Sequence, residues 1–404
     1  MGKSAPISMK LNRTNFSVLI IYPLFIIALL ILYCVKYDTG WFEWGMAICA
    51  YYMYNISIGV GLHRLWSHAS YKTNKVVEFI LMVVSSGTLQ GPVIAWSSDH
   101  AYHHTYMDTE LDPHTPLQFK SRIKGFFWSH IGWMLFEDKS RKKIDKGTMK
   151  RLGRNKLLIF QLRHYWKIAA FMNFIAPALI GYAIGGDLRS AFAGYVFIGF
   201  ARAFQQQMTF CVNSATHFLG NQPYMNGTPG EIPWMFFLLL GENWHNFHHA
   251  FARDYRNGWK WFQLDIHKWI IYALSKVGLA HDLVVTPKVR ILAKQEETRL
   301  ELIEMMRAKL SDVEGQALSI ADMARQKLKS LEKGAEIFAD SVKAKLVQLE
   351  DAAEKLVQNV QAKVENCSFK SQDEIVKVAL SQLAKLELMA DKLGLIIHTQ
   401  QHTS

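Results

Sequence analysis

The chain begins with an apolar run that is long enough to cross a lipid bilayer. Residues 16–35, FSVLIIYPLFIIALLILYCV, contain no charged side chain, and the hydrocarbon core of a bilayer requires about 20 such residues in a helix. A segment surrounded by lipid must satisfy its backbone hydrogen bonds internally, so it has to be helical. The run is too long for a signal peptide and lacks a small-residue cleavage site, so we interpret it as a membrane span.

Further apolar runs predict an all-α integral membrane protein with four transmembrane helices arranged in two hairpins. The spans are expected at about residues 16–35, 44–62, 168–186 and 190–212. The last run contains Arg202 and Gln205–Gln207, which must face protein or water rather than lipid. Residues 76–97 are also apolar but are interrupted by glycine and proline, so we expect a re-entrant or surface-lying helix there, with a fifth span as the alternative.

Positive charge is concentrated in the first part of the chain. The net charge is +12, and residues 1–288 hold 29 Lys/Arg against 16 Asp/Glu. Many of these cations lie between the second and third spans, and cytoplasmic loops of membrane proteins are enriched in Lys and Arg. We therefore expect this loop, both termini and the segment after residue 213 on the cytoplasmic side. In an apolar chain this charge indicates a membrane protein rather than one that binds nucleic acid.

A change of composition near residue 288 predicts two domains, a membrane domain at 1–287 and an extension at 288–404. Residues 289–404 contain no Trp, Tyr or Pro and hold 17 Lys/Arg against 18 Asp/Glu. Between Ile303 and Val360 apolar residues recur at spacings of three and four, which is typical of a coiled coil with irregularities. We expect an amphipathic, coiled-coil-like helical extension that forms an oligomer or binds a partner helix. Binding along a membrane surface is the alternative.

Histidines gather in four short segments on the predicted cytoplasmic side. The nine histidines of these segments are His63, His68, His100, His103, His104, His217, His245, His248 and His249. The pattern H-x-x-H-H occurs twice, and in a helix such positions share one face. His63 and His68 are five apart, about 140° around a helix, so we expect a helix end or bend between them. Asn213 and His217, four apart, again share a face.

Such a cluster predicts a metal centre. Neutral imidazole is a good ligand for iron, zinc, copper and nickel. A tetrahedral zinc takes four ligands, so nine histidines fit two ions of higher coordination number better. The remaining histidines lack this clustering and are interpreted as ordinary interior or surface residues: His114, His130, His164, His267 and His281. A metal transporter is an alternative, but its ligands should lie near the bilayer midplane, whereas these lie at or beyond span ends.

These motifs resemble those of the membrane-bound fatty acyl desaturases, most closely the stearoyl-CoA (Δ9) group. The matching segments are GLHRLWSH, DPH, GFFWSHIGW, NSATH and HNFHH, and the resemblance covers about residues 40–286. It implies a cytosolic helical cap that holds two iron ions, with the nine histidines as ligands and Asn213 holding a water. It also implies the use of O2 to form a cis double bond. A fatty acyl hydroxylase on the same scaffold is the alternative.

The resemblance further implies a kinked hydrophobic tunnel with Gln90, Trp96 and Thr209 at its bend, which favours a Δ9 product. Without the resemblance, Trp96 can equally be an aromatic of the membrane interface. Carboxylates near the histidines are candidates for orienting imidazoles, and for the last three of them solvated loop charges are an equal reading: Asp99, Asp108, Asp112 and Glu242.

The substrate carrier and the electron donor are open at this point. Ser98 and Ala101 stand where animal acyl-CoA desaturases have arginines, one of which contacts the CoA head group, so an acyl-CoA, an acyl-lipid or an acyl-carrier substrate is possible. The chain has no His-Pro-Gly-Gly haem motif, which implies a separate donor: a ferredoxin, a rubredoxin-type protein or a cytochrome b5. The sequence that follows HNFHH, FARDYRNGWKWFQLDIHKW, resembles bacterial members of the family. This resemblance predicts a multi-pass protein of a bacterial inner membrane.

Overall fold

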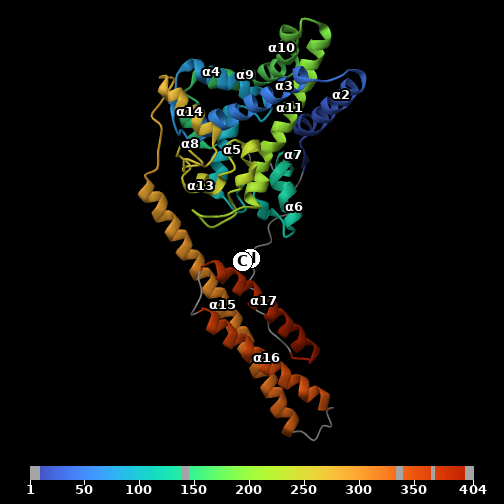
Figure 1. Ribbon diagram of the computed structural model, residues 1–404, viewed down its shortest axis with the longest axis vertical. Helices are drawn as coiled ribbons and strands as arrows, with labels where there is room; N and C mark the ends of the chain where they lie inside the picture. Colours follow the sequence, from blue (N-terminus) through green and yellow to red (C-terminus); the bar gives the residue numbers. More distant parts are fainter. Residues whose placement is uncertain (1–9, 138–144, 334–339, 365–368, 396–404) are drawn as a thin grey trace. The chain divides into compact units, whose positions relative to one another are not determined.

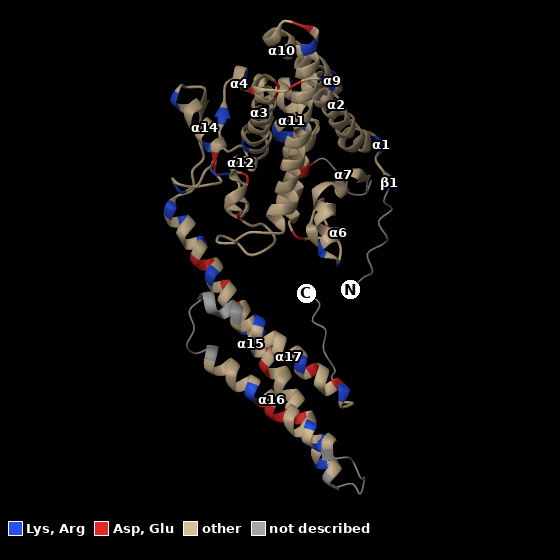
Figure 2. Ribbon diagram, turned by 45° about the vertical axis from the view of Figure 1, so that its right-hand side comes forward, with Lys and Arg blue, Asp and Glu red and all other residues tan. Residues whose placement is uncertain are grey.

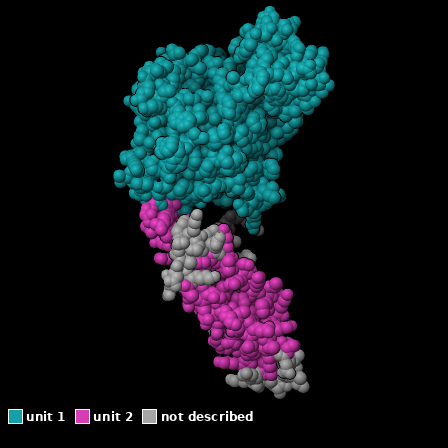
Figure 3. All heavy atoms as spheres, viewed as in Figure 1, with its two compact units in different colours: residues 1–295 teal, residues 296–404 magenta. Residues whose placement is uncertain are grey.

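The computed structural model describes residues 10–137, 145–333, 340–364 and 369–395. The chain forms two compact units, Met1–Gln295 and Glu296–Ser404, which are coloured separately in Figure 3. The division falls inside the long helix α15 (Lys288–Lys333), which begins where the sequence predicts the second domain. The division of the chain into functional domains stays a prediction.

Three helical segments of the first unit have the length and composition of membrane spans. They are Arg13–Lys36, Trp41–Ser67 and Lys156–Gly185. The first consists of α1 (Arg13–Phe16), η1 (Ser17–Ile21) and α2 (Tyr22–Lys36), the second of α3 (Trp41–Ile56) and η2 (Ser57–Ser67), and the third of α9 (Lys156–Ala170), η5 (Phe171–Ile175) and α10 (Ala176–Gly185). These segments contain the first three predicted spans, apart from Gly186 at the end of the third.

The fourth predicted span corresponds to α11 (Leu188–Ser214), which is not among the three candidate spans. This helix packs against α2, α3 and α10 and so occupies the middle of the unit (Figure 1). Arg202, Gln205 and Gln206 are completely buried, which confirms that they face protein rather than lipid. A helix covered by other helices does not need a uniformly apolar surface, and this explains its lower hydropathy. The four-span topology stays a prediction.

The hairpin between α10 and α11 depends on close approach of two backbones. Gly186 ends α10 with φ +81°, and Asp187 caps α11 by accepting a hydrogen bond from Ser190 N at 2.7 Å. A Cβ on Gly181 would lie 2.1 Å from Ser190 O, and one on Gly194 would lie 2.3 Å from Pro177 O. Small residues allow such contact between helices in a membrane, and this hairpin therefore tolerates no side chain at either glycine.

The segment that carries His63 is a π-helix. Within η2 the backbone is wound with bonds between residues five apart, and His68 N continues this pattern by donating to His63 O at 3.1 Å. Residues five apart then lie above one another, as residues four apart do in an α-helix. The helix η2 ends at Ser67, so the expected helix end does lie between His63 and His68, and the helical period changes as well.

Residues 76–97 form parts of two helices. They are α4 (Lys75–Gly87, 13 residues) and α5 (Val93–Tyr106, 14 residues), separated by a turn at residues 88–92. Neither is long enough to cross a bilayer, so the alternative of a fifth span is not supported. Helix α5 continues beyond the apolar run and carries the second histidine segment.

Short elements complete the first unit. The helical ones are η3 (Pro116–Gln118), α6 (Arg122–Phe127), η4 (Trp128–Gly132), α7 (Trp133–Leu135), α8 (Lys146–Leu152), η6 (Ala215–His217), η7 (Pro233–Met235), α12 (Phe236–Leu239), α13 (His245–Ala250) and α14 (Ile266–Lys276). Strand β1 (Lys10–Leu11) pairs antiparallel with β3 (Phe136–Glu137), and β2 (Lys72–Thr73) pairs with β4 (Ala280–His281). Most of these elements follow α5 and α11 in the chain, and α13 and η6 carry histidines themselves.

The second unit consists of α15, α16 (Asp340–Val364) and α17 (Phe369–Lys392). Figure 2 shows charged residues along these helices, whereas α2 is almost free of them. The apolar stripe is buried inside the unit: Leu310, Ala317 and Ala324 of α15 belong to the same core as Leu349 and Ala353 of α16 and Ala379 and Leu386 of α17. Residues 365–368, between α16 and α17, lie outside the described residues.

Candidate metal centre and cavity

Five histidines from three segments form one group of ligand atoms. His63 and His68 come from η2 and its end, His100 and His104 from α5, and His248 from α13, and one nitrogen of each lies within 4.8 Å of the others. The closest Nε2 pairs are His68 with His100 at 2.7 Å, His63 with His248 at 2.9 Å and His104 with His248 at 3.0 Å. Their lone pairs converge on one small region.

Four histidines form a second group beside the first. His103 comes from α5, His217 from η6, and His245 and His249 from α13, with ligand atoms again within 4.8 Å of one another. The Nε2 atoms of His217 and His245 are 2.9 Å apart, and those of His245 and His249 are 3.0 Å apart. The two H-x-x-H-H helices thus each contribute to both groups. The structure therefore brings all nine predicted histidines together.

Burial favours the neutral imidazole in the eight of these histidines that lie outside the membrane segments. It lowers the pKa of the histidines outside the membrane segments, and neighbouring histidines lower it further. The pKa of His245 falls to about 3, and the pKa values of His68, His100, His103, His104, His217, His248 and His249 lie well below the ordinary value. A neutral imidazole has a free lone pair, which is the form that binds a metal. Each group can therefore hold a metal ion.

Glu242 holds His63, a member of the first group, at its Nδ1. Its Oε2 lies 2.8 Å from His63 Nδ1, and its Oε1 lies 3.0 Å from His267 Nδ1. Arg64, which is also buried, donates from Nη2 to Glu242 Oε1 at 3.1 Å. Burial raises the pKa of Glu242, but His63 and Arg64 outweigh it and hold the pKa well below its usual value. A carboxylate on Nδ1 fixes the ring so that Nε2 faces the other ligands.

Two aspartates support the second group. Both carboxylate oxygens of Asp112, which is 0% exposed, lie 3.1 Å from His103 Nδ1. Thr228 Oγ1 lies 2.8 Å from His217 Nδ1 and donates to Asp108 Oδ1 at 2.5 Å. Asp112 and Asp108 are therefore part of the centre, and the reading of them as solvated loop charges is wrong. The same correction applies to Glu242.

Two histidines that were interpreted as ordinary residues belong to this surrounding layer. The ring of His114 lies 4.1 Å from that of His103, centroid to centroid, and its Nδ1 is 4.0 Å from Asp112 Oδ1. His267 shares Glu242 with His63. A single histidine gives no spacing signal, so only the fold reveals these two. His130, by contrast, lies 2.9 Å from Ser214 Oγ and fits the expected interior role.

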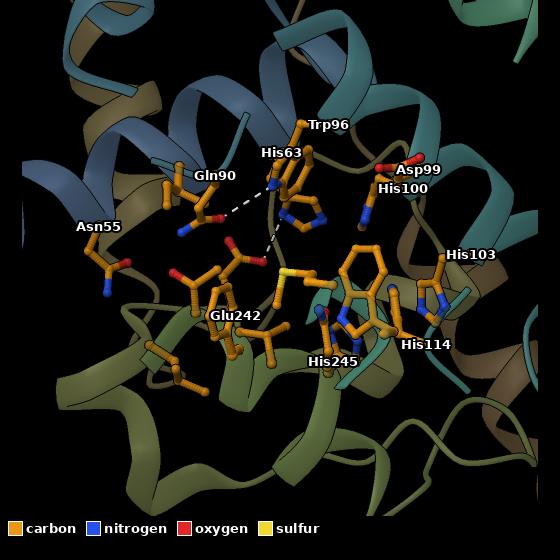
Figure 4. A pocket seen from close by; sticks show the side chains of 18 residues that line it. Asn55, His63, Gln90, Trp96, Asp99, His100, His103, His114, Glu242 and His245 are labelled. Atoms are coloured by element: carbon orange, nitrogen blue, oxygen red, sulfur yellow. Dashed lines mark hydrogen bonds and ion pairs between the residues drawn. The ribbon is translucent and has the colours of Figure 1, made fainter. Parts of the chain in front are cut away.

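A cavity of about 90 Å³ opens beside the histidines, and we call it the histidine cavity. Figure 4 shows Gln90 and Trp96 on one side of it, joined by a hydrogen bond from Trp96 Nε1 to Gln90 Oε1 at 3.3 Å. Thr209 and Asn213 of α11 also line it. Trp96 stacks on His100 with centroids 5.0 Å apart. The three predicted bend residues and Asn213 therefore share one cavity with four of the nine histidines, which are His63, His100, His103 and His245.

A larger cavity of about 480 Å³ adjoins the first and shares six of its lining residues, including Gln90 and Trp96. Apolar side chains dominate its wall, among them Leu89, Trp166 and Phe210. Asp99 lines both cavities and is exposed. Mostly apolar cavities with a few polar groups are typical of sites for small apolar ligands.

Comparison with known proteins agrees with this geometry. The family model described as Fatty acid desaturase matches residues 39–282. The chain belongs to the fatty acid desaturase family. The matched region contains both groups of histidines and all the residues that line the histidine cavity. The family relationship therefore covers the whole candidate site.

Several curated desaturases are similar to this chain. A probable acyl-CoA desaturase of Schizosaccharomyces pombe is 37% identical over 264 residues, which is 65% of this chain and 53% of that protein. Acyl-CoA desaturase 1 of Saccharomyces cerevisiae is 36% identical over 230 residues, or 56% of this chain and 43% of that protein. Human stearoyl-CoA desaturase is 34% identical over 263 residues, with 64% and 70% covered. The chain thus spans about half the length of the two yeast relatives.

Ser98 lies in a closed environment. This side chain is 1% exposed, and its Oγ accepts a hydrogen bond from Asp145 N at 2.7 Å, at the start of α8. Ser98 lines neither of the two cavities. Ser98 is therefore packed against the start of α8.

Proposed function

We propose that this desaturase-family protein is an O2-dependent di-iron fatty acyl desaturase that introduces a cis double bond, at Δ9, into a saturated long-chain acyl substrate. The observation that supports this most directly is the contact between the two groups of histidines and a mostly apolar cavity. An acyl chain in that cavity would pass Trp96, which stacks on His100 at 5.0 Å. The relatives named as acyl-CoA desaturases support the same reaction class.

The donor set fits two iron ions. Imidazole nitrogen suits iron, and the two groups supply five and four such nitrogens. We propose that His63, His68, His100, His104 and His248 hold one iron. His103, His217, His245 and His249 would hold the other, with Asn213 supporting a water beside it. When bound, the iron pair supplies the oxidising power for breaking unactivated C–H bonds with O2, which no protein side chain has.

The chain itself supplies orientation and an apolar environment. Glu242 and Asp112 hold the rings of His63 and His103 at Nδ1, so that each Nε2 faces its group. The walls of the histidine cavity hold the acyl chain and exclude bulk water from it. Two hydrogens leave neighbouring methylenes, and O2 is reduced to two waters with two electrons and two protons from an outside donor. We propose Gln90, Trp96 and Thr209 as the residues that contact the acyl chain.

The proposed setting is a membrane that the chain crosses four times. The helix α11 would form the fourth span because it is surrounded by α2, α3 and α10, so its polar residues do not meet lipid. Positive-inside charge then puts the termini and the metal centre on the cytoplasmic side. We propose a bacterial inner membrane, and this rests only on the resemblance of residues 251–269 to bacterial members.

The proposed partners follow from the sequence. Long-chain acyl-CoA is the first candidate substrate because relatives carry that name; an acyl-lipid or an acyl-carrier conjugate is the second, because Ser98 gives no cation to a CoA head group. Electrons would come from a separate ferredoxin, rubredoxin-type protein or cytochrome b5. Oligomer formation through α15–α17 would have to use a face other than the buried stripe.

The test is expression in a desaturase-deficient host, followed by gas chromatography of fatty acids with location of the double bond. The wild-type chain should produce a cis-Δ9 fatty acid. His104→Ala and His248→Ala should each abolish it, whereas His281→Ala, on the exposed end of β4, should not. A hydroxy acid without any alkene would assign the alternative hydroxylase activity. Absence of both products from folded, iron-loaded protein supplied with an electron donor would refute the proposal.

A further inference from the structure

The central helix α11 carries a group of polar side chains that the proposed chemistry does not use. Arg202, Gln205 and Gln206 are each 0% exposed, although they lie within a 27-residue helix. Removing a guanidinium from water is costly unless polar contacts replace the lost hydration.

Arg202 fixes the orientation of the Gln206 amide. Its Nη1 donates a hydrogen bond to Gln206 Oε1 at 3.0 Å, and its guanidinium carbon lies 5.0 Å from the ring centroid of Tyr22. Because a guanidinium can only donate, the oxygen of the amide must face it. The Nε2 of Gln206 is thereby directed away from Arg202 and toward the turn between α4 and α5.

On that side Gln206 holds the turn between α4 and α5. Its Nε2 donates to Thr88 O at 3.1 Å and to Leu89 O at 3.3 Å. Leu89 has φ +57°, a left-handed conformation that is unfavourable for a residue with a side chain. Such a turn persists only where its surroundings hold it. Gly91 N, which donates to Tyr165 OH at 2.9 Å, anchors the turn from a second direction.

The turn carries one wall of the histidine cavity. Gln90 follows Leu89 directly, accepts the hydrogen bond from Trp96 and lines both cavities. Gln205 has a parallel contact on the same cavity, because its Nε2 donates to Thr209 Oγ1 at 2.6 Å. Two adjacent glutamines of α11 thus hold two different points of the wall. The next residue, Gln207, lies 3.2 Å from His130 instead.

We infer that Arg202 and Gln206 are positioning residues that set the place of Gln90 and thereby select the carbon pair that is desaturated. This inference rests on the proposed desaturase function. All methylenes of a saturated chain are chemically alike, so the register of the chain in its cavity has to decide. A displacement of about 1 Å can change catalysis ~10²-fold, and a shift of that order is comparable to one carbon–carbon step along the chain.

The experiment compares double-bond positions in the product of the full chain and its variants. Gln206→Glu keeps an acceptor for Arg202 but removes the N–H donor to Thr88 and Leu89. Arg202→Met removes the group that orients Gln206, and Arg202→Lys retains a donor. Gln207→Glu is the matched control, because it makes the same chemical change one residue away. The readout is the ratio of alkene at neighbouring positions to alkene at the wild-type position, with total product measured separately.

Gln206→Glu and Arg202→Met should each raise this ratio about five-fold or more, the effect of losing one hydrogen bond of ordinary strength. Arg202→Lys and Gln207→Glu should keep the wild-type ratio. Lower yield at an unchanged ratio, or loss of all product or of folded protein from both Gln206→Glu and Arg202→Met, would overturn the inference. A wild-type chain that makes no alkene would instead refute the proposed function, so the two failures are distinguishable.

Discussion

His68 donates its backbone N–H to His63 O at 3.1 Å, and this one bond places two histidines that are five residues apart on one face. An α-helix would separate them by about 140°. The π-helical period of η2 reduces this separation, and both rings join the group of five. π-Helical segments are frequent at functional sites, and here the local winding itself assembles part of the centre.

Glu242→Ala should destabilise the protein strongly. The substitution leaves Arg64 buried without one of its two carboxylate partners and frees His63, so we expect a loss of about 3–5 kcal/mol in the free energy of unfolding. Denaturant unfolding in detergent, with metal content by mass spectrometry, measures both effects. Glu242→Gln retains the shape and one acceptor and should lie between wild type and Glu242→Ala. Equal stability of all three proteins would contradict the network.

Asp112→Asn should weaken the group of four histidines. The substitution replaces the carboxylate that holds His103 Nδ1 with a neutral amide. Loss of such a partner typically costs 10- to 100-fold in metal affinity or activity. Competition with a chelator gives the affinity, and product yield gives the activity. Glu110→Gln, an exposed neighbour, is the control and should change neither quantity. If Asp112→Asn behaves like Glu110→Gln, the support assigned to Asp112 is wrong.

Gly59→Ala should disturb the centre from a distance. A Cβ on Gly59 would lie 2.0 Å from the ring of His267, so the ring must move and take Glu242 with it. We expect a lower melting temperature in detergent and reduced iron content. Gly45→Ala is the matched control on the preceding helix, where a Cβ meets nothing within 4 Å; it should gain up to about 1 kcal/mol of stability.

Removing the extension should have different effects at two cut points. A chain ending at residue 295 keeps Ile291, which is 1% exposed and packs with Phe247 and Phe251 beside the HNFHH segment. This shortened chain should still form product. A chain ending at residue 287 loses that contact and should be less stable by about 2–5 kcal/mol. Fatty acid analysis and thermal unfolding compare the two. Loss of product from the longer chain would show that α15–α17 take part in activity.

Glu231 should make stability depend on pH. Burial raises the pKa of this carboxyl to about 8, although the Phe247 backbone and Lys260 act in the opposite direction. The folded state therefore binds a proton that the unfolded state releases above its own pKa near 4.5, so stability falls as the pH rises from about 5 to 8. Glu231→Gln should remove this slope and be the more stable protein at pH 8. Melting curves across this range would show parallel slopes if the idea is wrong.

The histidine segments could be predicted from spacing alone, whereas the meeting of segments from different parts of the chain follows from the fold. The H-x-x-H-H pattern points three rings in one direction wherever a helix forms, and both segments are helical here. The roles of His114 and His267 could not be predicted, because His114 lies in the centre only through the packing of its ring on His103, and His267 depends on Glu242, 25 residues away. The π-helical winding of η2 was also beyond a pattern that assumes an α-helical period.

Helix α11 and the extension also show that the sequence predicts which surfaces need a partner, but not which part of the chain supplies it. The polar residues of α11 predicted protein or water around them, and the structure confirms protein. The heptad stripe of residues 303–360 was interpreted as a surface for another chain, yet α15, α16 and α17 bury it among themselves. A heptad pattern specifies that a helix needs an apolar partner, but not whether that partner lies in the same chain.

The burial of Ser98 against Asp145 N has an evolutionary consequence. Each lengthening of this side chain would meet the backbone that begins α8, so a stepwise mutational path from serine to arginine passes through forms that push α8 away from α5. Introducing an arginine at position 98 therefore requires the backbone at Asp145 to move. Ser98→Arg alone should yield a strained protein rather than a new specificity.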